Sequence, residues 1–288
     1  AAANIEIEEI TSPGGIDAWL VEDHSIPFVA LEFWFDGGAA LDAPDQRGAT
    51  FLMTGLLEEG AGDMDAQAFA EAVEGLAASF DFDSFRDSVV ISARMLTQNR
   101  DEAAELLRAA LVEPAFDQAA IDRVRGQVLS IIEGNARDPE EIASATFNAM
   151  AYGDHPYGAP IEGTAETVAA LSRDDLLAAH RAALTRGRVA VGAAGDITAE
   201  ELGELIDRIL GDLPAEAPPR PDPVALDLPG GVTVVDFPSP QSVALFGHDG
   251  IARDDPDFFA AFVLNQVLGG SGFRSRLMEE VRVERGLT

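Results

Sequence analysis

Residues 48–60 read GATFLMTGLLEEG, and the rest of the chain is best interpreted outward from them. Apolar residues recur here at helical spacing, so we predict a helix from about Gly48 to Leu57. Positions three and four apart lie together on a helix, which places Phe51, Thr54 and Gly55 on one face. None of these three side chains can bind a divalent metal in that geometry or take a proton from water near neutral pH.

Strands and helices are predicted on both sides of this stretch. Alternating apolar residues predict strands over Ile5–Ile10, Asp17–Val21, Phe28–Phe35, Ala78–Phe82, Ser88–Leu96 and Arg188–Ala194. Helical periodicity predicts helices over Ala66–Leu76, Arg100–Leu111, Gln118–Asn135, Pro139–Ala151, Arg173–Leu184 and Ala199–Leu210. We therefore expect an α+β domain over residues 1–213, with a mixed β-sheet and helices packed on one face.

A second domain is expected after a proline-rich linker at residues 214–223, PAEAPPRPDP. Strands are predicted over Gly231–Phe237 and Ser242–Phe246, and helices over Pro256–Leu268 and Phe273–Arg285. This repeats the order of the first domain, so residues 224–288 are interpreted as the start of a similar domain. Two strands and two helices leave a sheet edge and an apolar face uncovered, so we expect this second domain to be incomplete.

The composition excludes several classes of protein. The formal net charge is −32 and every basic residue is Arg, so the chain repels nucleic-acid phosphates and anionic lipid surfaces. The acidity suits solubility or salt tolerance, and it also favours basic peptides as ligands. The chain contains no Cys, which excludes disulfides and thiolate metal sites.

Compartment is addressed only indirectly by the sequence. No run of about 18 apolar residues is present, so no membrane span is expected. The small residues at 1–4, AAAN, suit either a mature end left by signal cleavage or an artificial boundary. A periplasmic or otherwise exported location is the expectation, and a cytoplasmic one stays open.

Six motifs, taken in order, resemble the pitrilysin (insulinase-like) zinc peptidases. They cover nearly the whole chain from about Ser12, and each is weak alone. They are VEDHSIP at 21–27, Gly37-Gly38 followed by Gly48, DHPYG at 154–158 with Gly163-Thr164, AAGDI at 193–197, LGGSGFRSRL at 268–277, and Val281-Arg282 with Arg285-Gly286-Leu287.

The resemblance implies a zinc site whose ligands have been lost. Active relatives carry H-x-x-E-H, two zinc-binding His and a general-base Glu, at the positions of Phe51, Thr54 and Gly55. The third ligand, a Glu on a later helix, corresponds to Ile131 in a gapless alignment. Glu133 lies two residues further on, which is the wrong face of a helix. We therefore expect no metal in this chain.

The resemblance also implies a partner and one residue that acts on it. Members that have lost the motif often pair with a similar chain that keeps it, and supply an Arg and a Tyr that stabilise the oxyanion in the partner's zinc site. Arg282 matches that Arg, and the Tyr would follow Thr288. A surface salt bridge with Glu279 or Glu280 is the alternative role for Arg282.

Two further segments match substrate-binding elements of these peptidases. Ser79, Phe80, Asp81 and Phe82 resemble the edge strand along which an extended substrate pairs, although their alternation also suits an ordinary half-buried strand. Gly269, Gly270, Ser271 and Gly272 resemble a glycine-rich turn near the substrate chamber, or are simply a flexible turn. The run lacks the Lys of a phosphate-binding loop.

These features together predict the non-catalytic subunit of a heterodimeric zinc peptidase. The partner would carry H-x-x-E-H and the zinc, and the substrates would be unstructured peptides. A structural or peptide-binding protein of the same fold, without a role in proteolysis, is the second hypothesis. A third, an enzyme with unrelated chemistry, finds no constellation of nucleophile and base in the sequence.

Overall fold

The computed structural model describes residues 6–270 and 274–287, and its contacts divide the chain into two units. Unit 1 is Ala1–Leu245 and unit 2 is Phe246–Thr288. Domain limits at residues 213 and 223 stay a prediction.

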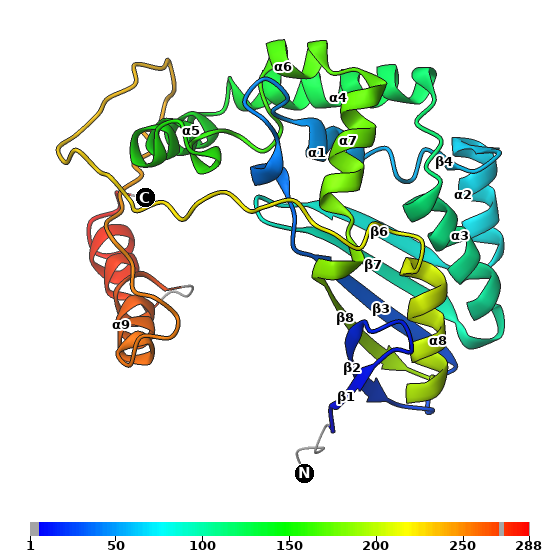
Figure 1. The fold of residues 1–288 in the computed structure, drawn as a ribbon. Coiled ribbons are helices and arrows are strands. Elements are labelled where there is room, and N and C mark those ends of the chain that lie inside the picture. The colour runs from blue at the N-terminus through cyan, green and yellow to red at the C-terminus, as the bar shows by residue number, and fades with distance from the viewer. Residues whose placement is uncertain (1–5, 271–273, 288) are drawn as a thin grey trace. The chain divides into compact units, whose positions relative to one another are not determined.

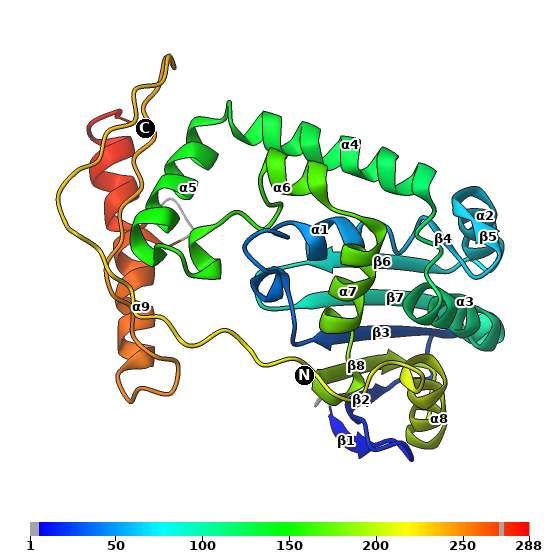
Figure 2. The same ribbon diagram turned by 45° about the horizontal axis from the view of Figure 1, so that its top comes forward.

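A six-stranded mixed sheet forms the centre of unit 1 (Figures 1 and 2). Its strand order is β1-β2-β8-β3-β7-β6; β2 and β8 are parallel, and the other neighbours are antiparallel. The strands are β1 Glu8–Thr11, β2 Asp17–Glu22, β3 Phe28–Phe35, β6 Ser79–Ser84, β7 Val89–Leu96 and β8 Val189–Gly195. A separate hairpin pairs β4, Gly60–Ala61, with β5, Met64–Asp65.

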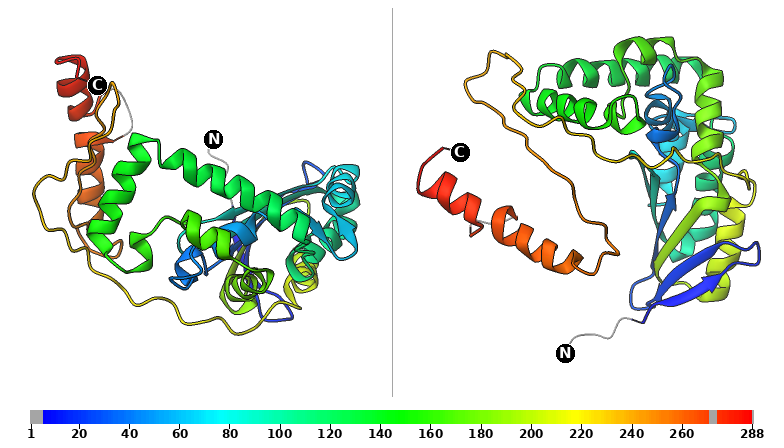
Figure 3. Two further views of the ribbon diagram at one scale, coloured as in Figure 1. Left: turned by 90° about the horizontal axis from the view of Figure 1, so that it is seen from above. Right: turned by 60° about the vertical axis from the view of Figure 1, so that its left-hand side comes forward.

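Helices cover one face of this sheet, which confirms the expected α+β class (Figure 3). The helices of unit 1 are α1 Ala49–Thr54, α2 Ala66–Gly75, α3 Arg100–Val112, α4 Gln118–Asn135, α5 Pro139–Tyr152, α6 Ala165–Ala170, α7 Arg173–Ala183 and α8 Ala199–Leu210. Of these, α5 lies apart from the sheet and contacts the turn at Pro156–Gly158. Short 3-10 turns occur at Ala39–Leu41, Thr97–Asn99, Pro156–Gly158 and Arg186–Arg188.

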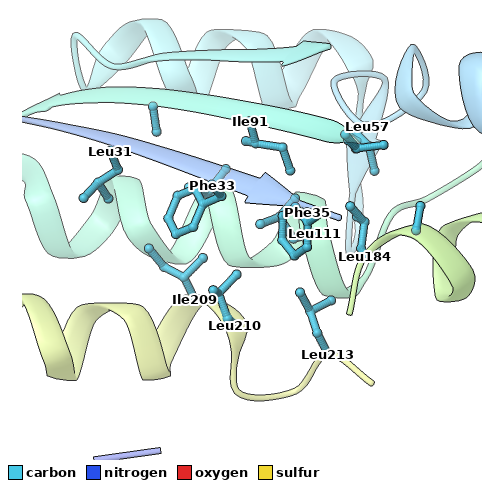
Figure 4. Packing of buried hydrophobic residues seen from close by; sticks show 14 of the residues in the cluster. Leu31, Phe33, Phe35, Leu57, Ile91, Leu111, Leu184, Ile209, Leu210 and Leu213 are labelled. Carbon is cyan, nitrogen blue, oxygen red and sulfur yellow. The ribbon is translucent and has the colours of Figure 1, made fainter. Parts of the chain in front are cut away.

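The core lies between the sheet and the helices. Along β3, Leu31, Phe33 and Phe35 are buried, whereas Glu32 and Trp34 between them are exposed on the other face. Figure 4 shows these three side chains meeting others from β7, α3, α8 and the residues that flank the helices. The opposite face of the sheet carries exposed aromatic side chains, including Trp19 and Trp34, which are 47% and 49% exposed.

The helix α1 is shorter than the predicted range of 48–57. It ends at Thr54, and Gly55 forms its C-terminal cap. Turns then lead to Gly60, whose φ of 119° belongs to a backbone region that side chains disfavour. The chain reverses there into β4, so residues 55–57 continue as turns although Leu56 and Leu57 remain buried.

The proline-rich linker is held against unit 1 along its length. The Pro214 carbonyl accepts from the Arg186 N–H at 2.9 Å, and Arg220 forms an ion pair with Asp36. The Asp222 carbonyl lies 3.0 Å from His155 Nε2. His155 Nδ1 accepts from the Tyr157 N–H at 3.2 Å, so Nε2 carries the proton and donates. The last anchor of this segment is the Asp227 N–H, which donates to the carbonyl of residue 151 at 3.1 Å.

The prediction of two strands beyond the linker is wrong. Residues 231–237 and 242–246 form no ladder with any strand in the part of the chain that the structure describes, so their backbone groups lack the pairing that a strand requires. The helix predicted at Pro256–Leu268 is confirmed as α9, Phe258–Gly269. The helix predicted at Phe273–Arg285 is reduced to a π-helical segment, η5, at Met278–Val283; residue 273 lies outside the described residues.

Candidate functional site: a zinc-peptidase site without its ligands

A buried carboxylate fixes the start of α1. Gly48 precedes the helix with a φ of 92° and no side-chain cap of its own. Asp42, from the preceding loop, accepts hydrogen bonds from the Gly48 N–H at 3.0 Å, the Thr50 N–H at 3.2 Å and the Thr50 hydroxyl at 2.6 Å. It therefore satisfies N–H groups that the first turn of a helix leaves unpaired. Burial raises the pKa of Asp42 to about 6, although these hydrogen bonds oppose the shift.

The three positions predicted to correspond to H-x-x-E-H take part in packing. Thr54 is 2% exposed, and its hydroxyl donates to the Thr50 carbonyl at 2.8 Å. Phe51 is half-buried and packs against the core. A Cβ at Gly55 would lie 3.3 Å from Val124 Cγ1 of α4, so the face that would hold a metal is closed against that helix.

Ile131 lies on α4 and is 42% exposed. It follows Val124 and Val128 at helical spacing, so the three occupy one stripe of α4. Glu133 lies off this stripe and forms an ion pair with Arg137 at 2.5 Å.

These residues do not fit a zinc ion. Zinc requires imidazole, thiolate or carboxylate ligands, and positions 51, 54, 55 and 131 offer two apolar side chains, a hydroxyl and a hydrogen. In the described part of the chain no group of three or more His, Cys, Asp or Glu residues is placed to hold a metal. No step of a hydrolytic reaction can therefore be assigned to these four positions.

Two acidic residues, Glu58 and Glu59, follow α1 closely in the sequence. Burial raises the pKa of Glu58, just beyond α1, and the neighbouring charges of Glu59 and Asp81 raise it further. Glu59 itself pairs with Arg123 of α4. Asp81 belongs to β6, so α1, α4 and β6 meet around the lost site.

The segment Ser79–Ser84 forms β6, an outer strand of the sheet (Figure 2). It pairs with β7 on one side, with Phe80 opposite Ala93 and Phe82 opposite Ile91. Phe80 and Phe82 pack towards the helices, whereas Ser79, Asp81 and Asp83 are exposed. Among the described residues β6 has no strand partner on its other side, so it is an edge strand of the sheet.

The remaining predicted residues lie in unit 2. Arg282 is exposed and belongs to η5. Gly269 ends α9, and the Gly270 N–H caps that helix by donating to the Gln266 carbonyl at 3.2 Å. A Cβ at Gly270 would lie 2.6 Å from the Gln266 Cα, so this position requires glycine. Ser271 and Gly272 lie outside the described residues.

Three features of unit 1 were missed by the sequence reasoning. Asp42 gave no signal, because its link to Gly48 depends on the path of the loop. His24 bridges two carboxylates, with Nδ1 2.5 Å from Asp196 and Nε2 2.7 Å from Glu22, and these contacts raise its pKa. The open face of the sheet holds a concavity of about 470 Å³ beside Trp19 and Trp34. The alternation of β3 predicts that Trp34 faces away from the core, but it does not predict the concavity.

The fold and this site define a zinc-peptidase scaffold whose metal ligands are absent, and the comparisons identify the family. The protein-family model for insulinase (peptidase family M16) matches residues 18–165 of the sequence. The family model for the peptidase M16 inactive domain matches residues 170–288. The chain belongs to peptidase family M16, which confirms the resemblance drawn from its motifs.

Individual relatives agree with this assignment. The non-peptidase homolog YmxG of Helicobacter pylori is 27% identical over 267 residues, covering 92% of this chain and 62% of that protein. The mitochondrial-processing peptidase subunit beta of Neurospora crassa is 23% identical over 245 residues, covering 82% of this chain and 51% of that protein. The chain thus spans between half and two thirds of the length of these relatives.

A solved structure gives the same result. The peptidase M16 inactive domain from Pseudomonas fluorescens superimposes with a TM-score of 0.84 at 29% identity. The match covers 99% of this chain and 69% of that one. Among the residues described, no helix is long and apolar enough to cross a membrane.

Proposed function

We propose that this chain is the non-catalytic subunit of a two-chain zinc peptidase. The proposal is supported by the residues at the four predicted motif positions, 51, 54, 55 and 131, none of which can bind zinc, on an M16 fold with an open edge strand. A homologous partner with H-x-x-E-H would supply the zinc and the general base. The two chains would enclose a chamber for unstructured peptides, in an exported compartment.

Arg282 is the residue that would serve the partner's chemistry. Hydrolysis by zinc-bound water places negative charge on the carbonyl oxygen of the scissile bond. A guanidinium keeps its charge at every relevant pH and offers fixed N–H donors to such an oxygen. The exposure of Arg282 on η5 supports a role towards another chain. The Neurospora relative is a subunit of a processing peptidase, which also supports an assembly of chains.

The edge strand would contribute substrate binding. Main-chain hydrogen bonds to β6 would align an extended peptide without regard to most of its sequence. This explains why a chain without ligands would keep an uncovered edge, which is otherwise a risk for aggregation.

The first test is purification of the tagged chain from its native host, followed by identification of what accompanies it. A stoichiometric chain carrying H-x-x-E-H is the expected result. A chain that emerges alone or as a homodimer contradicts the two-chain proposal.

The second test is Arg282→Ala in the reconstituted pair. Turnover of an unstructured peptide should fall about 100-fold, as on loss of one oxyanion donor. Arg276→Ala, an exposed Arg in the same segment, is the control and should retain full turnover. Equal turnover by both variants would remove Arg282 from the reaction but leave the pairing intact.

A scaffold or peptide-binding protein without a role in proteolysis is the second candidate. The name of the Helicobacter relative, a non-peptidase homolog, favours it. On this hypothesis Arg282→Ala has no effect on any peptidase, and the chain purifies without an H-x-x-E-H partner.

A further inference from the structure

The connection between β2 and β3 crosses the end of a third strand. In the sheet order β8 separates β2 from β3, so residues 23–27 pass the carboxyl end of β8. Three backbone hydrogen bonds fasten this connection to its neighbours. They run from the Asp23 N–H to the Gly195 carbonyl at 2.9 Å, from the Asp196 N–H to the Phe28 carbonyl at 2.9 Å, and from the Thr97 N–H to the Pro27 carbonyl at 3.0 Å.

One side chain of the connection lies between two carboxylates. His24 Nδ1 is 2.5 Å from Asp196 Oδ1, and His24 Nε2 is 2.7 Å from Glu22 Oε1. A neutral imidazole has one N–H and can donate to only one of these acceptors. Both contacts are hydrogen bonds only when the ring is an imidazolium, with an N–H on each nitrogen and a positive charge. We call Glu22, His24 and Asp196 the clamp.

The sheet fixes both carboxylates of the clamp. Glu22 ends β2 and is opposite Gly195, the last residue of β8. Asp196 follows directly, and its Oδ2 accepts from the Thr97 hydroxyl at 2.8 Å. Both negative charges therefore stay beside the ring when His24 loses its proton.

Two further charged groups act on the clamp. Asp23 adjoins it on the same connection, and its carboxylate accepts from the Ser25 N–H at 2.9 Å. Arg100, at the start of α3, adds a small electrostatic effect to the hydrogen bonds of His24 and Thr97, which lower the pKa of Asp196. The ion pairs of Arg100 are with Glu201 of α8 at 3.2 Å and with Asp101 at 3.7 Å.

We propose that the clamp is a pH-dependent device that holds the β2–β3 connection on the end of β8. While His24 is protonated, the ring bonds to both carboxylates and the connection is closed. The neutral ring donates to one carboxylate at most, and Glu22 and Asp196 are left as like charges on neighbouring strands. Residues 23–27 then open locally, while the rest of the sheet stays paired.

The direction of the pH dependence follows from the contacts of His24. The hydrogen bonds to Asp196 and Glu22 raise the pKa of His24 above its ordinary value. The stabilisation of the closed connection is therefore complete below the ordinary pKa of His, and it is lost as the pH rises through the raised value.

The test follows two signals of the full chain. Nitrogen NMR shifts of the His24 ring report its protonation and give the titration midpoint. Hydrogen exchange of the Asp23, Thr97 and Asp196 amides is measured below and above that midpoint, and is corrected for the intrinsic pH dependence of exchange. The Gly62 amide, whose hydrogen bond lies outside the connection, is the internal reference.

The midpoint should lie above the ordinary value for His. Above it, protection of the three amides should fall about fivefold, because two charge-assisted contacts are reduced to one neutral hydrogen bond. Protection of Gly62 should not change. Glu22→Gln should lower the midpoint, and His24→Gln should remove the pH dependence. His248→Gln is the matched control, because it removes an exposed His outside the clamp and should keep the dependence.

Three results would overturn the inference. A midpoint at the ordinary value would show that the ring is not held by both carboxylates. Unchanged protection of the three amides above the midpoint would show that the connection does not depend on the charge of His24. A loss of protection that persists in His24→Gln, or that extends to Gly62, would assign the pH dependence to another group or to global unfolding.

Discussion

At the scale of single residues, two of the positions predicted to correspond to the zinc motif take part in the packing of α1. The Thr54 hydroxyl donates a hydrogen bond to the Thr50 carbonyl of the same helix, and Gly55 allows α1 to approach Val124. That positions 51, 54, 55 and 131 offer no metal-binding group follows from residue types alone, and their correspondence to the zinc ligands of active relatives stays a prediction. The sequence did not predict the carboxylate of Asp42 beneath α1, because a loop contact has no periodic signal.

The raised pKa of Asp42 predicts an unusual dependence of stability on pH. Between about pH 4 and pH 6 the folded protein holds a proton that the unfolded chain has released. This contribution to stability is complete below about pH 4 and is lost as the pH rises through about 6.

The measurement is urea unfolding of the protein and of Asp42→Asn at pH 4 and pH 7. The free energy of unfolding of the protein, relative to that of the variant, should fall by about 3 kcal/mol between these pH values. A difference that does not change with pH would mean that Asp42 titrates normally in the folded state.

At the scale of elements, capping and hydrogen-bonded pairing explain where the sequence predictions succeeded. The helices α4 and α8 have the predicted limits, because Asp117 and Thr198 cap long amphipathic runs. The helix α6 was missed because it is only six residues long, and its capping box ends in Thr167 in place of Glu or Gln. Strands beyond the linker were predicted wrongly because alternation alone cannot provide a pairing partner.

Gly48 is predicted to be the residue of α1 least tolerant of substitution. Its φ is 92°, and a Cβ there would lie 2.3 Å from the Glu162 carbonyl oxygen. Gly48→Ala should therefore lower the free energy of unfolding by about 2 kcal/mol or more. Gly126→Ala in α4 is the control: it meets nothing within 4 Å and should stabilise the protein by about 0.5–1 kcal/mol. Thermal unfolding of both variants would check the contrast, and equal stability would contradict it.

Restoring the motif tests the register of the two helices. Phe51→His, Thr54→Glu, Gly55→His and Ile131→Glu together should produce zinc binding, measured by competition with a chromogenic chelator. The variant without Ile131→Glu should bind more weakly, because it lacks the third ligand. Thr54 is buried and Gly55 contacts Val124, so the melting temperature without metal should fall. A folded quadruple variant that binds no zinc would show that Ile131 is not the matching position.

At the scale of the whole molecule, the two units differ in how well their apolar surface is covered. The helix α9 is apolar on all sides, and Phe259 and Leu264 are 79% and 67% exposed. Such a helix is typical of a buried position. Unit 1, in contrast, encloses its core between the sheet and helices, and the sequence predicted this arrangement with few errors.

Limited proteolysis should distinguish the anchored and free parts of the segment between the units. Thermolysin cleaves before apolar residues, and Val232 and Val234 are 90% and 82% exposed. First cleavage is expected there, and not between residues 214 and 227, where the chain is anchored. His155→Gln would weaken the anchor at Asp222 and should admit cleavage nearer the linker. Early cleavage at 214–227 in the unaltered protein would contradict the anchoring.

The anchored linker also changes the effective length of the connection to unit 2. Residues 228–245 make no hydrogen bond to the rest of unit 1 as far as the structure describes it, so the unanchored tether begins after Asp227 and not at Pro214. Effective concentration varies roughly as the inverse three-halves power of tether length. Shortening the free segment in this way raises the local concentration of unit 2 around unit 1 about twofold, and loss of the anchors would lower it again.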